Sequence, residues 1–358
     1  MRKDLLRILV IGDTHFKQSR IREGEAFVDA CIVKVRMYNP EVIICLGDTL
    51  DTHHIVRVQP HRLAHRFLLS LTEVAPTYLL IGNHDLINHK QFLSDQHIFN
   101  PYKKWPRLTV VDAPLKVNIK NYKFIMCPYV PPGRFSEALD TLLETNSPFH
   151  WSVDVDCIFA HQEFHGSCMG SVVSTNGDEW SLAYPPVISG HIHEAQDLVE
   201  DNVFYPGSVL QHTFGEKTPK RIWLVTFGKS LDLPFDREFI NLGLKPRRVI
   251  KMNVEDVVAK FDFRCLHQAY IKLEISGTPE HLRMFRQAPI YSKLVLAGVK
   301  ISFLNLDVQA SDSLPERSFR KEMNSVERAT QYRTLLNHLV TQDNNVDLAE
   351  AYKELLDS

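Results

Sequence analysis

The sequence has no long apolar run, no closely paired cysteines and almost no net charge. No stretch of about 18 apolar residues occurs among its 358 residues, so no membrane-spanning helix is expected. The first apolar run is short and continues into GDTH, so we interpret it as a strand and not as a signal peptide. With a net charge of −2, any contact with nucleic acid must come from a local basic patch.

The cysteines also lack the close spacing that is typical of metal or disulfide sites. The six cysteines are scattered, no CxxC occurs, and Cys45 and Cys157 lie inside apolar runs. We therefore expect reduced, mostly buried thiols in an intracellular protein. Histidine, by contrast, is plentiful, with 17 residues.

The first two thirds of the chain alternate apolar runs with amphipathic segments. Apolar runs that end near Asp13, Asp48 and Asn83 predict three strands, and helical spacing predicts helices over 20–38 and 60–74. Short connections between them favour right-handed βαβ units. The strands are apolar throughout, which is typical of a sheet covered on both faces.

The pattern changes further along the chain. Several more strands are predicted up to residue 235, with one helix over 134–146. We expect an α/β protein in three parts: a main domain over 1–235, a small α/β module over 236–312 and a charged helical tail over 313–358.

Polar side chains follow the predicted strands at their ends, where α/β proteins build sites. Residues two apart in an extended chain point to the same side, so each Asp-x-His or His-x-His pair is expected to face one cleft. Carboxylates, imidazoles and an amide without thiolates suit Mn²⁺, Fe²⁺ or Zn²⁺. Seven such residues suffice for two ions about 3.5–4 Å apart, the arrangement used for phosphoryl displacement. The candidates are Asp13, His15, Asp48, Asn83, His161, His191 and His193.

Five short blocks carry a resemblance to a known family. GDTH, GDTLD, GNHD, AHQEF and GHIH occur in the order found in calcineurin-like metallophosphoesterases, over roughly residues 5–230. The resemblance implies a four-layer α/β/β/α sandwich. It also implies two divalent metal ions, with Mn²⁺ expected first and Mg²⁺, Fe²⁺ or Zn²⁺ as alternatives.

The same resemblance divides the candidates between the ions. One ion is assigned to Asp13, His15, Asp48 and His193. The other is assigned to Asp48, Asn83, His161 and His191, so that Asp48 bridges the pair. His84 is assigned as the catalytic histidine, held off the metals to stabilise or protonate the leaving oxygen, and Asp85 as the residue that orients the turn or His84.

Within that superfamily the chain resembles the SbcD and meiotic-recombination-eleven nucleases and the small subunits of tailed-phage recombination endonucleases. GDTLDTHH carries Asp51, as in the bacterial and phage forms, and YPGSVLQHTFGE at 205–216 resembles their segment after the last ligand pair. The small module is similar to their DNA-capping domain. PHRLAHRF lacks the Pro-Ser pair usual in the cellular forms, which leaves open how the DNA strand is guided there.

This closer resemblance implies a metal-dependent DNA exo- or endonuclease of a recombination and repair complex, acting on DNA ends, duplex or single strands. The implied partners are an SbcC-type coiled-coil ATPase, docked by the tail, and a second copy of this chain, through helices near 57–75 and 85–100. No membrane partner is expected. The expected localisation is cytoplasmic, or at intracellular sites of DNA replication or recombination, with a phage or virus as one source.

Some residues allow two interpretations. Asp51, His53 and His54 either belong to a solvated loop or include a contact to a substrate phosphate. Arg247 and Arg248 either lie on a solvated face or bind DNA phosphates without sequence preference. Each metal-ligand candidate alone is also an ordinary strand-end or helix-cap residue, and only the ordered set indicates a site.

Three other functions stay open. The same centre would serve another phosphoester, the chain would bind DNA ends without cutting them, or the fold would act as a metal-free scaffold. A zinc-protease pair of His161 and His165, four residues apart, would need a helix, which the strand-like DCIFAH disfavours.

Overall fold

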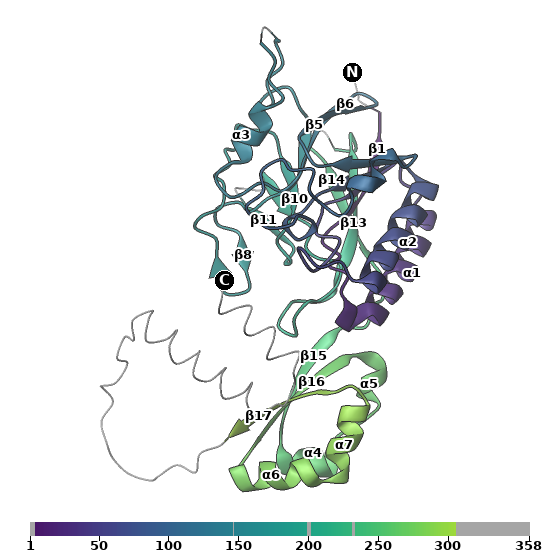
Figure 1. The fold of residues 1–358 in the computed structure, drawn as a ribbon, viewed down its shortest axis with the longest axis vertical. Coiled ribbons are helices and arrows are strands. Elements are labelled where there is room, and N and C mark those ends of the chain that lie inside the picture. Colours follow the sequence, from purple (N-terminus) through teal and green to yellow (C-terminus); the bar gives the residue numbers. More distant parts are fainter. Residues whose placement is uncertain (1–3, 146, 199–201, 231–232, 306–358) are drawn as a thin grey trace, which may run out of the picture. The chain divides into compact units, whose positions relative to one another are not determined.

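The computed structural model describes residues 4–305 apart from 146, 199–201 and 231–232 (Figure 1). Two six-stranded sheets form its centre. In the first, the order is β14-β13-β1-β2-β3-β4, with bounds β1 Leu6–Ile11, β2 Val42–Cys45, β3 Thr77–Leu80, β4 Leu108–Val111, β13 Arg221–Phe227 and β14 Asp236–Asn241. In the second, the order is β11-β12-β10-β7-β6-β5, with bounds β5 Leu115–Ile119, β6 Tyr122–Cys127, β7 Cys157–His161, β10 Val187–Gly190, β11 Gln196–Leu198 and β12 Val203–Tyr205.

The two predicted helices of the first half are confirmed. The first, α1 (Ile21–Tyr38), follows the short 3-10 helix η1 (Gln18–Arg20), and α2 is Val58–Val74. They connect β1 to β2 and β2 to β3, and both of these strand pairs are parallel. The expected βαβ units are therefore present, and they bring the carboxyl ends of β1, β2 and β3 to one edge of the sheet.

The four-layer sandwich is visible in the alternation of β1. Ile8 and Val10 pack into a core that lies between the two sheets, together with Phe124 of β6. Leu9 and Ile11 pack on the other face of the first sheet, in a core shared with α1 and α2. Because both faces of β1 are covered, its residues are apolar without interruption, as expected for a buried strand.

The fourth layer is thinner than predicted. The helix expected over 134–146 is only α3, Phe135–Asp140, because the following residues form turns and Asp140 instead accepts a hydrogen bond from Trp151 Nε1 at 2.7 Å. Trp151 and Trp180 stack at 5.7 Å and cover the outer face of the second sheet with α3. Aromatic loops thus replace most of the predicted helix.

The predicted helix near 85–100 is wrong. That region holds only the 3-10 helices η2 (Asn83–Asp85) and η3 (Asn100–Lys104). Between them Asn88 accepts a hydrogen bond from the Lys90 amide, and Ser94 accepts one from the Gln96 amide. Such local side-chain bonds offer the backbone an alternative to helical hydrogen bonding.

A separate three-stranded sheet follows residue 246. Its strands β15 (Arg247–Asn253), β16 (Tyr270–Gly277) and β17 (Lys300–Asn305) are parallel, in that order. Buried and partly exposed residues alternate along β16, and Leu273 and Ile275 share a core with Phe285. The helices of this module are α4 Val254–Lys260, α5 Cys265–Gln268, α6 Pro279–Gln287 and α7 Pro289–Leu296. A small α/β module is therefore present, while the predicted tail lies outside the described residues.

Two smaller features complete the described chain. A hairpin joins β8 (Cys168–Met169) to β9 (Val172–Val173). Four of the six cysteines are buried and all six are free thiols, as expected. In the part of the chain that the structure describes, no helix is long and apolar enough to cross a membrane.

Candidate metal centre

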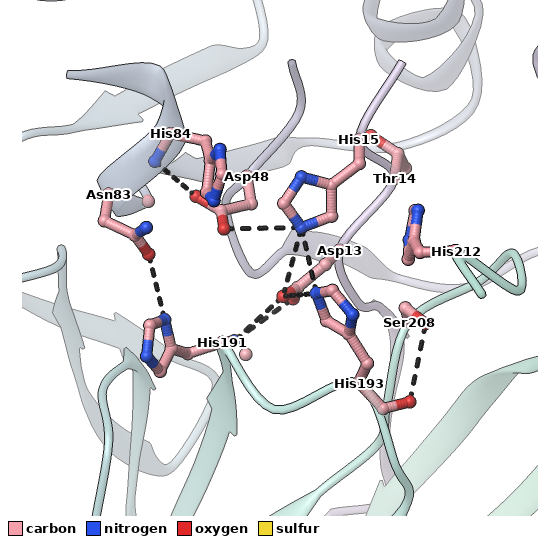
Figure 2. A network of polar contacts seen from close by, with 12 residues as sticks. Asp13, Thr14, His15, Asp48, Asn83, His84, His191, His193, Ser208 and His212 are labelled. Atoms are coloured by element: carbon pink, nitrogen blue, oxygen red, sulfur yellow. Dashed lines mark hydrogen bonds and ion pairs between the residues drawn. The ribbon is translucent and has the colours of Figure 1, made fainter. Parts of the chain in front are cut away.

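All seven predicted metal ligands converge at one place, at the carboxyl ends of strands from both sheets. Figure 2 labels these ligands except His161. In the first sheet, Asp13 follows β1, Asp48 follows β2 and Asn83 follows β3. In the second, His161 is the last residue of β7, and His191 comes directly after β10. The sandwich therefore brings the ends of its two sheets together around one cluster of polar side chains.

The backbone at this cluster is not extended, whereas the prediction that each Asp-x-His or His-x-His pair faces one cleft assumed an extended chain. His15, Asp48 and His191 have positive φ values of 41°, 48° and 80°. Non-glycine residues rarely adopt this conformation, and it concentrates at functional sites. The His191 amide donates to both carboxylate oxygens of Asp13, and Ile192 is buried in the core, which holds the turn in place.

Two glycines leave room for the carboxylates. A Cβ on Gly82 would collide with the Asp48 carboxylate. A Cβ on Gly190 would lie 2.8 Å from both Asp13 Oδ1 and His161 Nδ1. These close approaches require glycine in the GNHD and GHIH blocks.

The first ligand group lies around His15. Its Nε2 is 3.0 Å from His193 Nε2, 3.4 Å from Asp48 Oδ2 and 4.0 Å from Asp13 Oδ2. His193 Nε2 is in turn 3.9 Å from Asp13 Oδ2. These four residues are the set that the resemblance assigned to one ion.

The second ligand group lies around Asn83. Its Oδ1 is 3.2 Å from His161 Nε2 and 2.9 Å from His191 Nδ1, and His161 Nε2 is 3.5 Å from Asp48 Oδ2. His161 Nδ1 donates to the Leu46 carbonyl at 2.7 Å, so a neutral His161 presents the lone pair of Nε2 to two oxygen acceptors. Acceptors that face one another are satisfied by a cation, so the residues fit a divalent ion here.

The charges of these residues depend on their burial. Burial opposes ionisation of Asp48, but His161 and His15 hold the pKa of its carboxyl well below the usual range. Burial likewise opposes a charge on His161, but Asp48 outweighs it and raises the pKa of His161 to about 9. Burial lowers the pKa of His15 below its usual value. Without an ion, the cluster thus favours a proton on His161 next to Asp48, a positive charge that a bound cation would supply instead.

His84 and Asp85 lie beside the ligands. The His84 backbone amide donates to Asp48 Oδ1 at 2.8 Å, and His84 Nδ1 donates to the Asp51 carbonyl at 2.9 Å, which leaves Nε2 without that bond. His53 stacks on His84 with ring centroids 4.7 Å apart. His84 also belongs to a possible three-residue ion site with His15 and Asp48, so the geometry alone does not hold it off the metals.

Asp85 connects two of the loops. Its carboxylate accepts hydrogen bonds from the amides of Thr49, Leu50 and Gly82, at 3.0 to 3.2 Å. Burial and the charge of Asp48 raise the pKa of Asp85 to about 8, although the amides of Gly82 and Leu50 act to lower it. Asp85 therefore ties the loop after β2 to the turn after β3, and its orienting role stays a prediction.

The remaining predicted contacts are dispersed. Asp51 pairs with Lys17 at 2.7 Å and lies 3.9 Å from His15 Nδ1, whereas His54 is exposed and bonds the Ile87 carbonyl. Arg247 forms an ion pair with Glu23 at 2.5 Å and donates to the Gln211 carbonyl, so its guanidinium is used inside the protein. Arg248 is exposed.

Sequence reasoning missed three residues that support the ligands. Glu163 lies 3.7 Å from His191 Nε2, and Glu216 lies 3.9 Å from His193 Nδ1 and pairs with Lys220 at 2.8 Å. His212 packs its ring 4.7 Å from both His15 and His193. Glu163 belongs to the AHQEF block, and the other two lie in the 205–216 segment, so position in these blocks was the only signal.

A cavity of about 470 Å³ opens over the centre. It is lined by Asp48, Asn83, His84, Met169, Gly170, His191, His193, Glu194, Thr213, Gly215 and Glu216. Ligands of both groups and His84 therefore face a space that a substrate can enter.

Comparison with known proteins agrees with this geometry. Residues 6–195 match the family model of the calcineurin-like phosphoesterases. The chain belongs to this family. It is 40% identical over 266 residues to "Putative phosphoesterase 244L" of Invertebrate iridescent virus 6, covering 68% of this chain and 91% of the relative. It is 35% identical over 318 residues to "Putative phosphoesterase 078R" of Invertebrate iridescent virus 3, covering 87% of this chain and 89% of the relative.

Among solved structures, the purple acid phosphatase PPD1 from yellow lupin seeds aligns with 67% of this calcineurin-like phosphoesterase and 52% of its own chain. The identity is 9% and the TM-score 0.40. As a member of its family, the protein is a metallophosphoesterase that uses divalent metal ions, and the converging carboxylate, imidazole and amide groups fit them.

Proposed function

We propose that this phosphoesterase is a two-metal phosphodiesterase acting on DNA, the nuclease subunit of an SbcD-type recombination or repair complex. The observation that carries the proposal is the meeting of two ligand groups at Asp48, beside His84 and under an open cavity. Mn²⁺ is the ion we expect in both positions. The two viral relatives support a virus as the source of the chain.

When bound, the two ions supply a nucleophile at neutral pH and stabilise charge on the phosphoryl oxygens. Asp48 would hold both ions, and the position of its Oδ2, which faces His15 and His161, supports this role. The bond from His84 Nδ1 to the Asp51 carbonyl fixes the ring, so Nε2 of the doubly protonated ring is the atom that would give a proton to the leaving oxygen. Stacking by His53 restricts the same ring further.

Two features support DNA over a small phosphoester. The GDTLDTHH and 205–216 segments resemble those of the SbcD-type nucleases, and both lie at the centre: His53 stacks on His84, and Glu216 faces His193. The small module follows the phosphoesterase domain where those nucleases carry a DNA-capping domain, and Arg248 on its first strand is exposed.

The proposal is tested by His84→Gln. We expect Mn²⁺-dependent cleavage of linear duplex DNA to fall by about 10²–10⁴-fold, the usual effect of removing a general acid, while both ions stay bound. Cleavage is followed on gels, bound metal by elemental analysis and folding by circular dichroism. His165→Gln, at an exposed histidine, is the matched control.

Either of two outcomes would contradict the proposal. One is DNA cleavage by His84→Gln at the wild-type rate. The other is hydrolysis of p-nitrophenyl phosphate without cleavage of any DNA, which would indicate an enzyme for other phosphoesters. DNA-end binding without hydrolysis would favour the non-catalytic alternative.

We also propose a homodimer and an SbcC-type ATPase partner. Ile55 and Val56, just before α2, and Val58, its first residue, are exposed apolar residues that a second copy could cover. Val58→Asp is then expected to convert dimer to monomer in light scattering, and an unchanged mass would count against this surface. Co-purification of the full chain with a coiled-coil ATPase, lost on deletion of 313–358, tests the tail.

A further inference from the structure

The lining of the cavity over the metal centre has unlike parts. Ligands and His84 form one part, and the tip of the β8–β9 hairpin, with Met169 and Gly170, forms another. The rest comes from Glu194 and from the loop with Thr213, Gly215 and Glu216. Its volume of about 470 Å³ lies within the 300–1,000 Å³ range of pockets that hold small organic ligands. The cavity therefore has room for more than the phosphate that the ions bind.

The hairpin is held firmly although it is exposed. Gln196 forms two hydrogen bonds with the Cys168 backbone. Its Nε2 donates to the Cys168 carbonyl at 2.9 Å, and its Oε1 accepts from the Cys168 amide at 2.8 Å. At the base, the Ser174 amide donates to the Ser167 carbonyl at 2.8 Å. At the tip, Gly170 has a φ of 65°, which a turn of this kind requires. The hairpin thus presents its side chains from a defined position.

Those side chains are apolar and face water in the free protein. Met169 is 43% exposed, Val172 60% and Val173 55%. Of the three, only Met169 lines the cavity. Apolar side chains held at the mouth of a polar site mark a surface for a ligand, and methionine adapts well to flat, polarisable groups.

The lining offers no cation for a second phosphate. Among the described residues that line this cavity there is no Lys or Arg, and Lys220 behind it is already paired with Glu216. A neighbouring cavity of about 300 Å³ differs in this respect, because Lys17 and Arg57 line it. A phosphate next to the reacting one would find no cationic side chain to pair with in the first cavity, whereas an uncharged group needs none.

From the apolar hairpin, the volume and the missing cations, we infer that this cavity binds the uncharged nucleoside part of the substrate, the base and its sugar, with Met169 against the base. The hairpin is then a specificity element that favours nucleotide esters over simple phosphoesters. This inference rests on the proposed function only in that the substrate is a nucleic acid. It requires neither a duplex nor a partner chain.

The test compares two esters with the same leaving group in the metal-loaded full chain. Thymidine 5′-(p-nitrophenyl phosphate), or its 3′ isomer, carries a nucleoside, and methyl p-nitrophenyl phosphate carries a methyl group in its place. We expect the wild type to prefer a nucleoside ester. Met169→Ser is expected to raise KM for that ester by about 10-fold, with kcat nearly unchanged, and to leave the methyl ester unaffected.

Val172→Ser is the matched control, because Val172 lies in the same hairpin but does not line the cavity. It is expected to behave as the wild type. Equal losses on both esters in Met169→Ser would overturn the inference, because the hairpin would then support the metal centre only. Equal activity of the wild type on both esters would overturn it as well.

Binding separates this inference from the proposed function. Titration calorimetry on His84→Gln measures the affinity for thymidine monophosphate against inorganic phosphate, with and without Met169→Ser. Tighter binding of the nucleotide that depends on Met169 supports the inference even if no DNA is cleaved. Equal affinity for nucleotide and phosphate would overturn it even if DNA cleavage is observed.

Discussion

The two halves of the metal centre share Asp48 but are supported differently. In the second half, the His161 imidazole donates to the Leu46 carbonyl at 2.7 Å, a contact between the ends of β7 and β2. In the first half, His193 Nδ1 faces the Glu216 carboxylate at 3.9 Å, and Glu216 comes from the 205–216 segment after the last ligand pair. His15 Nδ1 is buried without a hydrogen-bond partner among the described residues.

This difference indicates where the centre is rigid. A carbonyl at the end of a buried strand moves little, so the imidazole that it orients is fixed by the fold itself. A carboxylate on a loop fixes its imidazole only as long as the loop keeps its own contacts. We therefore expect the second half to tolerate changes outside the sandwich, and the first half to depend on the 205–216 segment.

The largest effect is expected from Asp48→Asn, which removes the charge shared by both halves. The asparagine oxygen can still accept from the His84 amide, so the fold is expected to persist. Both ions should be lost. The fall in metal affinity should exceed the ~10–100-fold loss that is usual when a residue supporting a ligand is substituted. Elemental analysis after gel filtration measures this. Loss of one ion alone would show that Asp48 is not the shared ligand.

The next effect separates the halves. His191→Ala is expected to weaken the ion of the second half, and His193→Ala the ion of the first, because their ligating nitrogens face Asn83 and His15 respectively. Titration calorimetry with Mn²⁺ should show one strong and one weakened site in each variant. If either variant lost both ions equally, the division of GHIH between two ions would be wrong.

Much of this centre could be predicted, because its ligands follow strands. Apolar runs ending in Asp13, Asp48 and Asn83 place those residues at one sheet edge whatever the packing is. The division into two groups came from the family resemblance, and the contacts around His15 and Asn83 agree with it. The sandwich came from the same resemblance, and the alternation of β1 agrees with it.

The rest depends on tertiary contacts that no local pattern encodes. The positive φ values of His15 and His191 exist because the Asp48 carbonyl and the Asp13 carboxylate bind their amides. Glu216 reaches His193 from 23 residues away in sequence, which spacing cannot reveal. The helix expected near 85–100 is lost to local side-chain bonds that compete with helical hydrogen bonds.

A smaller effect is expected from the carboxylates behind the ligands. Glu216→Gln should weaken the first ion by about 10-fold, because the His193 imidazole loses the charge that orients it. Glu163→Gln should weaken the second ion less, because the His161 imidazole of that half keeps its bond to the Leu46 carbonyl. Calorimetric titration of both variants measures the contrast. Equal effects on both ions in Glu216→Gln would remove the distinction between the halves.

The smallest effect concerns the anchor of the 205–216 segment. Arg247 pairs with Glu23 and bonds the Gln211 carbonyl, so it ties this segment to α1. Arg247→Gln is expected to lower affinity for the first ion by a few fold and to leave the second unchanged, since second-half ligands do not depend on this segment. Arg248→Gln, at the exposed neighbour, is the matched control and should leave both ions unchanged while it reduces DNA binding at low salt. If Arg247→Gln reduced DNA binding and left ion affinity intact, the arginine would be a DNA contact and the first half would not need this anchor.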